Sequence, residues 1–227
     1  MTKYLLSAAL IAMTVAPVSA TILTFDDDDG VANAEAISQA YGDNVSAGST
    51  SEGNYGVGAE GFTPNVTVSY GQGAELPLLW TTGYNELTNV LYVEPDGITT
   101  FTLNFVADTG FVVDLFDFDL GNFGGAVTLQ NVQVFGDDGT ELYASGPVMV
   151  PGAGGSSISF APNVSSSSLT LFLDLTGLGG NSDNMGLDNI RFGQAADLLP
   201  EPVPAPAGLG LLGLAILGLA GLRRIHG

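Results

Sequence analysis

The chain has 227 residues, no cysteine, one histidine, and 24 acidic residues against four basic ones, which gives a formal net charge of −20. No disulfide can stabilise the fold, and thiol nucleophiles are excluded. Since the only histidine is His226, close to the C-terminus, histidine-based triads and zinc sites in the main domain are excluded as well. The negative charge argues against nucleic acid as a partner, because phosphates would be repelled.

Residues 1–20 have the three parts of a secretory signal peptide. Lys3 supplies the positive end, residues 4–15 are apolar, and Val18-Ser19-Ala20 is a small-residue cleavage site. The apolar part is too short for a permanent membrane span. We therefore expect cleavage after Ala20 and export of a chain that begins at Thr21.

Most of the following sequence alternates apolar and polar residues, the pattern of half-buried β-strands. In residues 99–106, for example, Phe101, Leu103 and Phe105 share one face. Glycine-rich turns separate the runs, and residues 33–40 suggest a turn or two of helix. The expected strands lie at residues 21–25, 66–70, 78–81, 90–93, 99–106, 111–119, 127–134, 141–143, 156–160, 169–175 and 186–192.

Two of these runs change phase. Val113 and Leu115 lie on one face of their strand, whereas Phe116 and Phe118 lie on the other. A shift of one residue inside a strand is the sequence sign of a β-bulge. Residues 127–134 repeat the pattern and predict a second bulge.

The number of short strands, about nine to twelve, and the lack of an amphipathic helix predict an all-β antiparallel β-sandwich over residues 21–196. A jelly roll is the favoured topology at this size. The opening residues 23–27 (Leu-Thr-Phe-Asp-Asp) and the closing residues 186–192 (Gly-Leu-Asp-Asn-Ile-Arg-Phe) resemble those of carbohydrate-binding-module-like or galactose-binding-like jelly rolls. This resemblance implies that the first and last strands are neighbours.

If those strands are neighbours, Asp26 and Asp27 come close to Asp188 and Asn189. Clustered oxygen ligands suit Ca²⁺, which would neutralise the carboxylates and join the ends of the domain. The alternative is that residues 26–29 form a solvated loop and Asp188 caps a turn. A second acidic group, formed by Asp114, Asp117, Asp119 and Asn122, is interpreted as a solvated strand face.

Three aromatic residues, Trp80, Tyr84 and Tyr92, are close in sequence and could form a stacking surface for a sugar, with Tyr55 and Tyr70 as further candidates. The alternative is that Trp80, which follows two leucines, belongs to the core.

The C-terminal region has its own organisation. Residues 197–206 are proline-rich and contain Pro200-Glu201-Pro202, residues 207–222 are apolar, and Arg223-Arg224 follow. As a helix the apolar run would reach about 24 Å, slightly less than a hydrocarbon core of about 30 Å. A plain C-terminal anchor is one interpretation.

The same order of a Pro-Glu-Pro motif, a short apolar helix and a basic end resembles the PEP-CTERM sorting signal of Gram-negative bacteria, although this tail has only two arginines. The resemblance implies a transmembrane sorting helix at residues 207–227 and recognition by an exosortase in the inner membrane. It further implies cleavage near the motif and delivery to the cell surface or the extracellular polysaccharide matrix.

We therefore expect an exported, non-catalytic protein that acts in adhesion, sugar binding or calcium association in a matrix or biofilm. Two alternatives stay open. One is an extracellular carbohydrate-active enzyme that uses paired carboxylates, the only acid–base groups that this composition leaves. The other is a structural matrix component without a small ligand.

Overall fold

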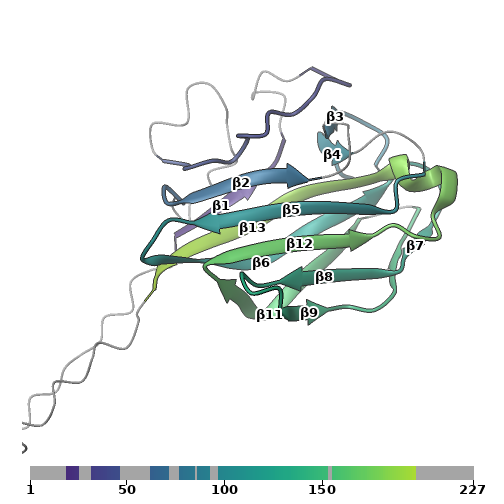
Figure 1. Ribbon diagram of the computed structural model, residues 1–227. Coiled ribbons are helices and arrows are strands. Elements are labelled where there is room, and N and C mark those ends of the chain that lie inside the picture. The colour runs from purple at the N-terminus through teal and green to yellow at the C-terminus, as the bar shows by residue number, and fades with distance from the viewer. Residues whose placement is uncertain are drawn as a thin grey trace, which may run out of the picture. The chain divides into compact units, whose positions relative to one another are not determined.

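The computed structural model describes residues 19–25, 32–46, 62–71, 77–84, 86–92, 97–152 and 155–197 (Figure 1). Within them the chain is all-β and its strand pairs are antiparallel, as predicted. The elements are β1 Ser19–Leu23, β2 Val66–Gly71, β3 Leu78–Trp80, β4 Val90–Tyr92, β5 Thr100–Ala107, β6 Phe111–Asn122, β7 Val127–Leu129, β8 Asn131–Phe135, β9 Glu141–Ala144, β10 Val148–Val150, β11 Ser156–Ser166, β12 Ser168–Asp174, the 3-10 helix η3 Gly179–Asn184, and β13 Met185–Ala196.

The strands form two large sheets and one small one. A six-stranded sheet has the order β11-β6-β13-β4-β3, with β1 also paired to β13, and a five-stranded sheet has the order β2-β5-β12-β8-β9. In Figure 1 the five-stranded sheet lies in front of β13 and β6. β7 and β10 pair separately.

The two large sheets are not built from separate parts of the chain. Consecutive strands such as β5 and β6, or β12 and β13, lie in opposite sheets, so the chain crosses between the layers repeatedly, a pattern compatible with the predicted jelly roll. The first strand, β1, lies beside the last, β13, with Leu23 opposite Ile190. The predicted neighbourhood of the two ends of the domain is therefore confirmed.

The core lies between the two sheets. The odd-numbered residues Phe101, Leu103 and Phe105 of β5 are 0–1% exposed, as their alternation predicts. Phe105 meets Phe192 of the opposite sheet with ring centroids 5.0 Å apart. Each such side chain contributes about 1.5–3 kcal/mol through burial, so the core can stabilise the fold without a disulfide.

The bulge predicted in residues 111–119 is present. The pairing between β6 and β13 shifts between Asp188 and Arg191 and again between Arg191 and Phe192. As a result Val113 and Leu115, and then Phe118, all reach the core. The turn at residues 137–139 also closes the expected hairpin, which joins β8 to β9.

Two expectations are wrong. Residues 33–40 form turns and an isolated bridge from Ala36 to Leu78, with no helix. Residues 127–134 contain two strands of different sheets in place of one bulged strand, because β7 pairs with β10 and β8 pairs with β12. Alternation alone does not reveal where a chain leaves one sheet and enters another.

The segment 32–46 covers the edges of both large sheets. Along β3, the Ala34 amide donates to the Leu79 carbonyl at 2.8 Å, and the Leu79 amide donates to the Glu35 carbonyl at 3.0 Å. Along β2, the Gln39 side chain donates to the Tyr70 carbonyl at 2.9 Å and accepts from the Tyr70 amide at 3.0 Å. These bonds occupy backbone groups that would otherwise be free to pair with another chain.

The chain divides into two compact units, Met1–Ala196 and Asp197–Gly227. Strand β13 ends at Ala196, the last residue of the first unit.

Candidate functional site

The structure brings the three predicted aromatic residues together on the outer face of the six-stranded sheet, at its β3–β4 edge. Trp80 meets Tyr92 edge to face, with ring centroids 5.6 Å apart and an interplanar angle of 80°. Tyr84 belongs to the same apolar cluster, which is separate from the main core. Phe123, just after β6, completes the group at 6.3 Å from Trp80 and 5.9 Å from Tyr84.

Glycines make room for this cluster. Gly121 of β6 and Gly186 of β13 are direct cross-strand partners. A Cβ atom on Gly186 would lie 2.8 Å from ring carbons of Tyr84, so Tyr84 packs directly on this glycine pair. In the same way the ring of Phe123 lies on Gly83, whose φ of +97° is in the region that favours glycine.

Burial divides the cluster into a base and a surface. Tyr84 and Tyr92 are 2% and 4% exposed and cannot offer a ring face to a ligand. Trp80 is half-buried, and Phe123 is 46% exposed. The surface available for stacking therefore consists of Trp80 and Phe123, which we call the aromatic patch.

Polar contacts hold the loop around the patch. Asn33 Oδ1 accepts hydrogen bonds from the Thr81 amide at 2.9 Å and the Thr81 hydroxyl at 3.1 Å. Glu86 accepts a hydrogen bond from the Gly155 amide at 2.7 Å. Thr81 directly follows Trp80 in the sequence, and Glu86 lies two residues after Tyr84, so these polar groups belong to the same segment as the aromatic cluster.

Sequence reasoning did not identify Phe123 as a site residue. The sequence feature that could have pointed to Phe123 is its place between the end of a strand, at Gly121-Asn122, and the glycine pair Gly124-Gly125. Such a residue has no strand neighbour to cover it. Only the fold, however, shows that it reaches Trp80, more than forty positions earlier in the chain.

The predicted acidic site is described in part. Asp26 and Asp27 lie outside the described residues. Asp188 is 5% exposed and is the cross-strand partner of Asp119. The side-chain nitrogen Nδ2 of Asn189 donates to Oδ2 of Asp119 at 2.9 Å and to Oδ2 of Asp188 at 3.3 Å. Among the described residues, no three acidic, histidine or cysteine side chains are grouped so as to hold a metal ion.

Asn189 adopts a φ of 50°, which asparagine tolerates better than most residues, and it lies at the bulge of β13. The bulge thereby places a neutral donor between two carboxylates. The two hydrogen bonds reduce the repulsion between these carboxylates.

The second acidic group is only partly solvated. Arg191 donates to Asp117 through Nη2 at 2.5 Å and through Nε at 3.1 Å, and the two side chains are 33% and 26% exposed. The guanidinium carbon also lies 5.1 Å from the ring centroid of Phe116. Arg191 therefore neutralises one carboxylate of β6 and covers an outward-facing aromatic ring.

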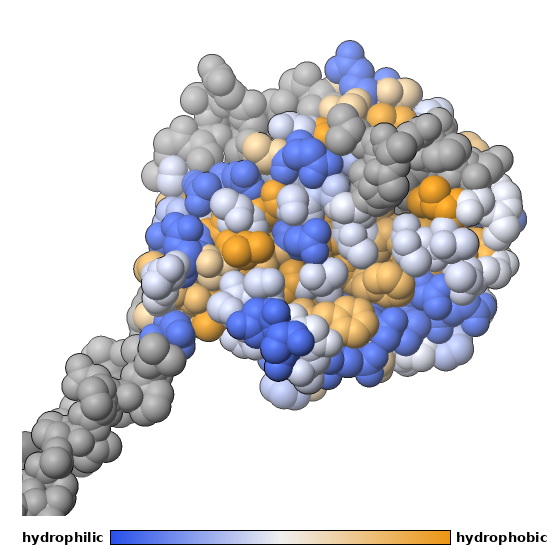
Figure 2. Space-filling view, in the orientation of Figure 1, coloured by the Kyte–Doolittle hydropathy of each residue, from blue (hydrophilic) through white to orange (hydrophobic). Residues whose placement is uncertain are grey.

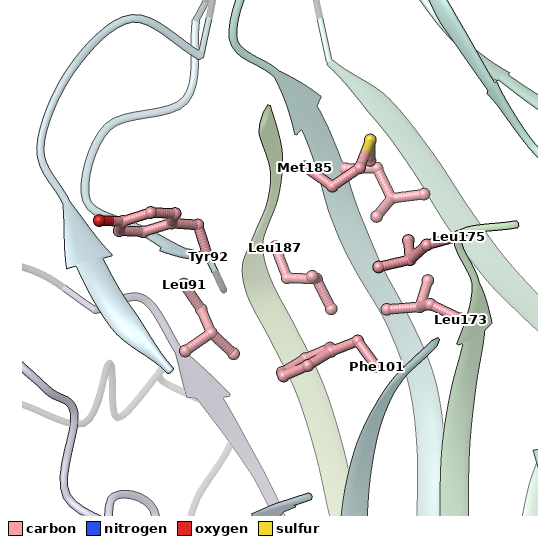
Figure 3. Close-up of a pocket in the computed structure, with 8 residues that line it drawn as sticks. Leu91, Tyr92, Phe101, Leu173, Leu175, Met185 and Leu187 are labelled. Carbon is pink, nitrogen blue, oxygen red and sulfur yellow. The ribbon is translucent and has the colours of Figure 1, made fainter. Parts of the chain in front are cut away.

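A small pocket between the sheets has no polar lining. Figure 3 shows Leu173 and Leu187 lying around Phe101, while the hydroxyl of Tyr92 points away from the pocket. Its volume of about 10 Å³ is room for about one water molecule at most, so it is a packing defect and not a ligand site. It is lined by Leu91, Tyr92, Phe101, Leu120, Leu173, Leu175, Met185 and Leu187.

The predicted processing sites are mostly outside the described residues, which include none of Pro200, Glu201, Pro202, Arg223 and Arg224. Ala20, the predicted signal-cleavage residue, lies in β1 opposite Gly193 and is 2% exposed. In the part of the chain that the structure describes, there is no helix of sufficient length and hydrophobicity to cross a membrane.

No protein-family profile and no curated protein matches the chain. Solved structures with partial similarity include the family 11 carbohydrate-binding module from Clostridium thermocellum in complex with a β-1,3-1,4-mixed-linked tetrasaccharide, at 13% identity and a TM-score of 0.32 over 56% of this chain and 88% of that one. The family 32 module from C. perfringens NanJ in complex with galactose matches at 8% identity and a TM-score of 0.33, over 57% and 93% of the two chains.

An arabinose-bound α-L-arabinofuranosidase matches at 12% identity and a TM-score of 0.35 over 79% of this chain, which spans 31% of the length of that enzyme. The carbohydrate-binding modules among these neighbours are β-sandwiches. At such TM-scores no ligand or activity is transferred from these structures to this chain.

Proposed function

We propose that this protein is a non-catalytic sugar-binding protein and that the aromatic patch is its binding surface. The faces of sugar rings are apolar and stack on aromatic side chains, while rim hydroxyl, amide and carboxylate groups bind the sugar hydroxyls. The patch of Trp80 and Phe123, with Asn33, Thr81 and Glu86 around it, offers both kinds of group.

One observation carries the proposal. Phe123 leaves 46% of its surface exposed although its ring is held between Gly83, Trp80 and Tyr84. An exposed aromatic ring on a rigid base gains nothing for the folded monomer from its exposed face, whereas a ligand could stack there without first ordering it. Since the chain has a net charge of −20, an uncharged sugar is favoured over an acidic one.

The place of action is a further part of the proposal. The signal-like residues 1–20 and the tail of residues 197–227 support export, exosortase sorting at the inner membrane, and delivery to the cell surface or the extracellular polysaccharide matrix. Mass spectrometry of the secreted and membrane fractions tests this route. We expect a product that begins at Thr21 and ends near Pro202, and recovery of the intact chain from the cytoplasm would contradict it.

A structural calcium ion at the joined ends of the domain is also proposed, with Asp26, Asp27, Asp188 and Asn189 as ligands. The pairing of β1 with β13 supports it, because Leu23 lies opposite Ile190, one residue from Asn189. We expect millimolar Ca²⁺ to raise the melting temperature relative to EDTA. Identical transitions would remove calcium from the proposal.

Trp80 is the only tryptophan in the chain, so its fluorescence reports directly on the aromatic patch. We expect a panel of neutral oligosaccharides to include one that changes the Trp80 emission saturably. The variant Phe123→Ala should bind that sugar about tenfold more weakly, equivalent to about 1.4 kcal/mol of lost contact. Met149→Ala removes an apolar side chain that is 67% exposed on β10 and serves as the matched control.

A structural protein without a ligand would give no saturable change with any sugar in the panel, and that result would refute the proposal. Release of reducing ends from the bound polysaccharide, abolished by substitution of one Asp or Glu, would instead identify a carbohydrate-active enzyme.

A further inference from the structure

The outer face of the five-stranded sheet differs in charge from the outer face of the six-stranded sheet. Strand register places Ser69, Asn104, Thr170 and Phe135 in one row across β2, β5, β12 and β8. The next row contains Thr102, Phe172 and Gln133. We call these two rows the neutral face, because none of their residues is ionisable.

The opposite side of the sandwich shows the contrast. The outward residues of β6 in the six-stranded sheet include Asp114, Asp117 and Asp119. In a chain of net charge −20, acidic residues would be expected on both outer faces. Beside the neutral face, Asp174 lies two residues after Phe172 on β12, and Glu141 of the edge strand β9 accepts a hydrogen bond from the Gln133 side chain.

The neutral face is also ordered by its own contacts. The Thr170 hydroxyl donates to Asn104 Oδ1 at 2.8 Å, and the Thr102 hydroxyl donates to the Gly71 carbonyl at 2.7 Å. Phe135 and Phe172 meet edge to face, with ring centroids 6.2 Å apart, and both are partly exposed. Figure 2 shows hydrophilic and hydrophobic residues interleaved over this side of the molecule.

Charge decides which partner such a surface fits. A polyanion is repelled by the whole molecule, and a polycation would prefer the carboxylates of the opposite face. Nothing in the two rows repels or attracts a neutral partner by charge. Amide and hydroxyl groups around partly exposed aromatic rings instead match a chain of hydroxyl groups and apolar ring faces.

We propose that the neutral face is a second binding surface and that its ligand is an uncharged polysaccharide laid across β5, β12 and β8. The surface lies on the opposite side of the sandwich from the aromatic patch, so it goes beyond the function proposed above and does not depend on it. Binding is expected to be weak at any one point and to draw on several sugar units, because the contacts are spread over two rows.

The test is affinity electrophoresis of the folded exported protein in gels that contain dextran, galactomannan or alginate. We expect at least one of the two neutral polymers to retard the protein and alginate, a polyanion, to have no effect. Phe172→Ala and Asn104→Ala should each weaken the retardation about tenfold, whereas Met149→Ala should not. Asn104→Ala removes a half-buried amide and the hydrogen bond that it accepts from the Thr170 hydroxyl, but it leaves the Phe135–Phe172 contact in place, so it keeps the test valid if Phe172→Ala fails to fold.

Trp80 separates this surface from the aromatic patch. Binding at the neutral face should leave the Trp80 emission unchanged and should persist in Phe123→Ala. The inference is overturned if neither neutral polymer retards the protein, if both neutral-face variants bind as the wild type does, or if retardation disappears with Phe123→Ala alone. Self-association through this face would appear as a sedimentation shift without polymer that Phe172→Ala reverses, and this too would overturn it.

Discussion

The substitution Gly186→Ala tests whether the aromatic patch depends on its glycine base. The new methyl carbon would lie 2.7 Å from Cγ2 of Val90 and 2.8 Å from two ring carbons of Tyr84. Favourable carbon–carbon contacts are about 3.5–4.0 Å long, so the neighbours must move by about 1 Å. Tyr84 is 2% exposed and is also in contact with Phe123, so it cannot move without disturbing the patch.

Overpacking of this kind costs about 1–3 kcal/mol. For a domain of this size each kcal/mol lowers the melting temperature by about 2–4 °C. Urea unfolding followed by Trp80 fluorescence measures both consequences in one experiment. We expect a lower urea midpoint, and a changed emission of the folded protein, since Trp80 contacts Tyr92 and Phe123 beside the displaced ring.

Gly125→Ala and Gly180→Ala provide matched controls, because a Cβ atom at either position meets nothing within 4 Å and neither glycine has a positive φ. Both should unfold near the wild-type midpoint with the wild-type emission. If Gly186→Ala behaves as these two variants do, Tyr84 does not pack on the sheet as described and the rigid base of the aromatic patch does not exist.

Three further outcomes follow from other contacts. Gln39→Ala should remove the partners of the Tyr70 backbone amide and carbonyl at the edge of β2 and lower the free energy of unfolding by about 1–2 kcal/mol. Aggregation, followed by light scattering, should become faster because the edge can then pair with another chain. Unchanged scattering would show that the edge is protected by other means. Arg191→Lys should lower the free energy of unfolding in urea by at most about 1 kcal/mol, because the ion pair with Asp117 is partly exposed. A larger loss would show that solvent does not screen this pair. The Thr140 amide donates a hydrogen bond to the Asp138 carboxylate and holds its pKa below the ordinary value of 3.8. The ionised carboxylate therefore stabilises the folded protein above pH 3.8, and this stabilisation is lost as the pH falls through the lowered pKa. Asp138→Asn should remove this part of the acid sensitivity, which is measured by comparing urea titrations at about pH 3 and about pH 7.

The strands could be predicted because burial on one face leaves a period of two in the sequence. Phe101, Leu103 and Phe105 follow that period and are buried in the core. The phase change after Leu115 predicted the bulge for the same reason, because apolar residues of β6 must face the core on both sides of the irregularity. Local patterns of this kind need no knowledge of distant residues.

The segment 32–46 could not be predicted in this way. Its order depends on bonds to strands thirty or more positions later, such as those between Gln39 and Tyr70, so its own sequence carries little periodicity. The break between β7 and β8 was not predicted, because Leu129 and Val132 are both buried although their strands belong to different sheets. Burial alone therefore does not show which sheet a residue belongs to.

Of the candidate site, sequence proximity identified Trp80, Tyr84 and Tyr92 but not their unequal exposure. Tyr84 is buried because it packs on a glycine pair of β6 and β13, far away in the chain, and Tyr92 is buried within the same apolar cluster. The neutral face was missed because its rows exist only after register is set. The residues of the two rows come from four strands, and no strand contributes more than two of them.

The positions of the two proposed surfaces limit what the protein could do with a polymer. The aromatic patch lies on the outer face of the six-stranded sheet and the neutral face on that of the five-stranded sheet, with the core between them. A stiff polysaccharide chain cannot bend around a sandwich whose sheets lie about 10 Å apart, so the two surfaces would engage different chains. Two weak binding sites on opposite faces of one rigid domain would then link neighbouring polysaccharide chains. The overall affinity of this linkage would rise with the number of protein molecules bound to each chain. Such cross-linking requires both surfaces, so Phe123→Ala or Phe172→Ala alone should weaken it about tenfold while the other surface still binds.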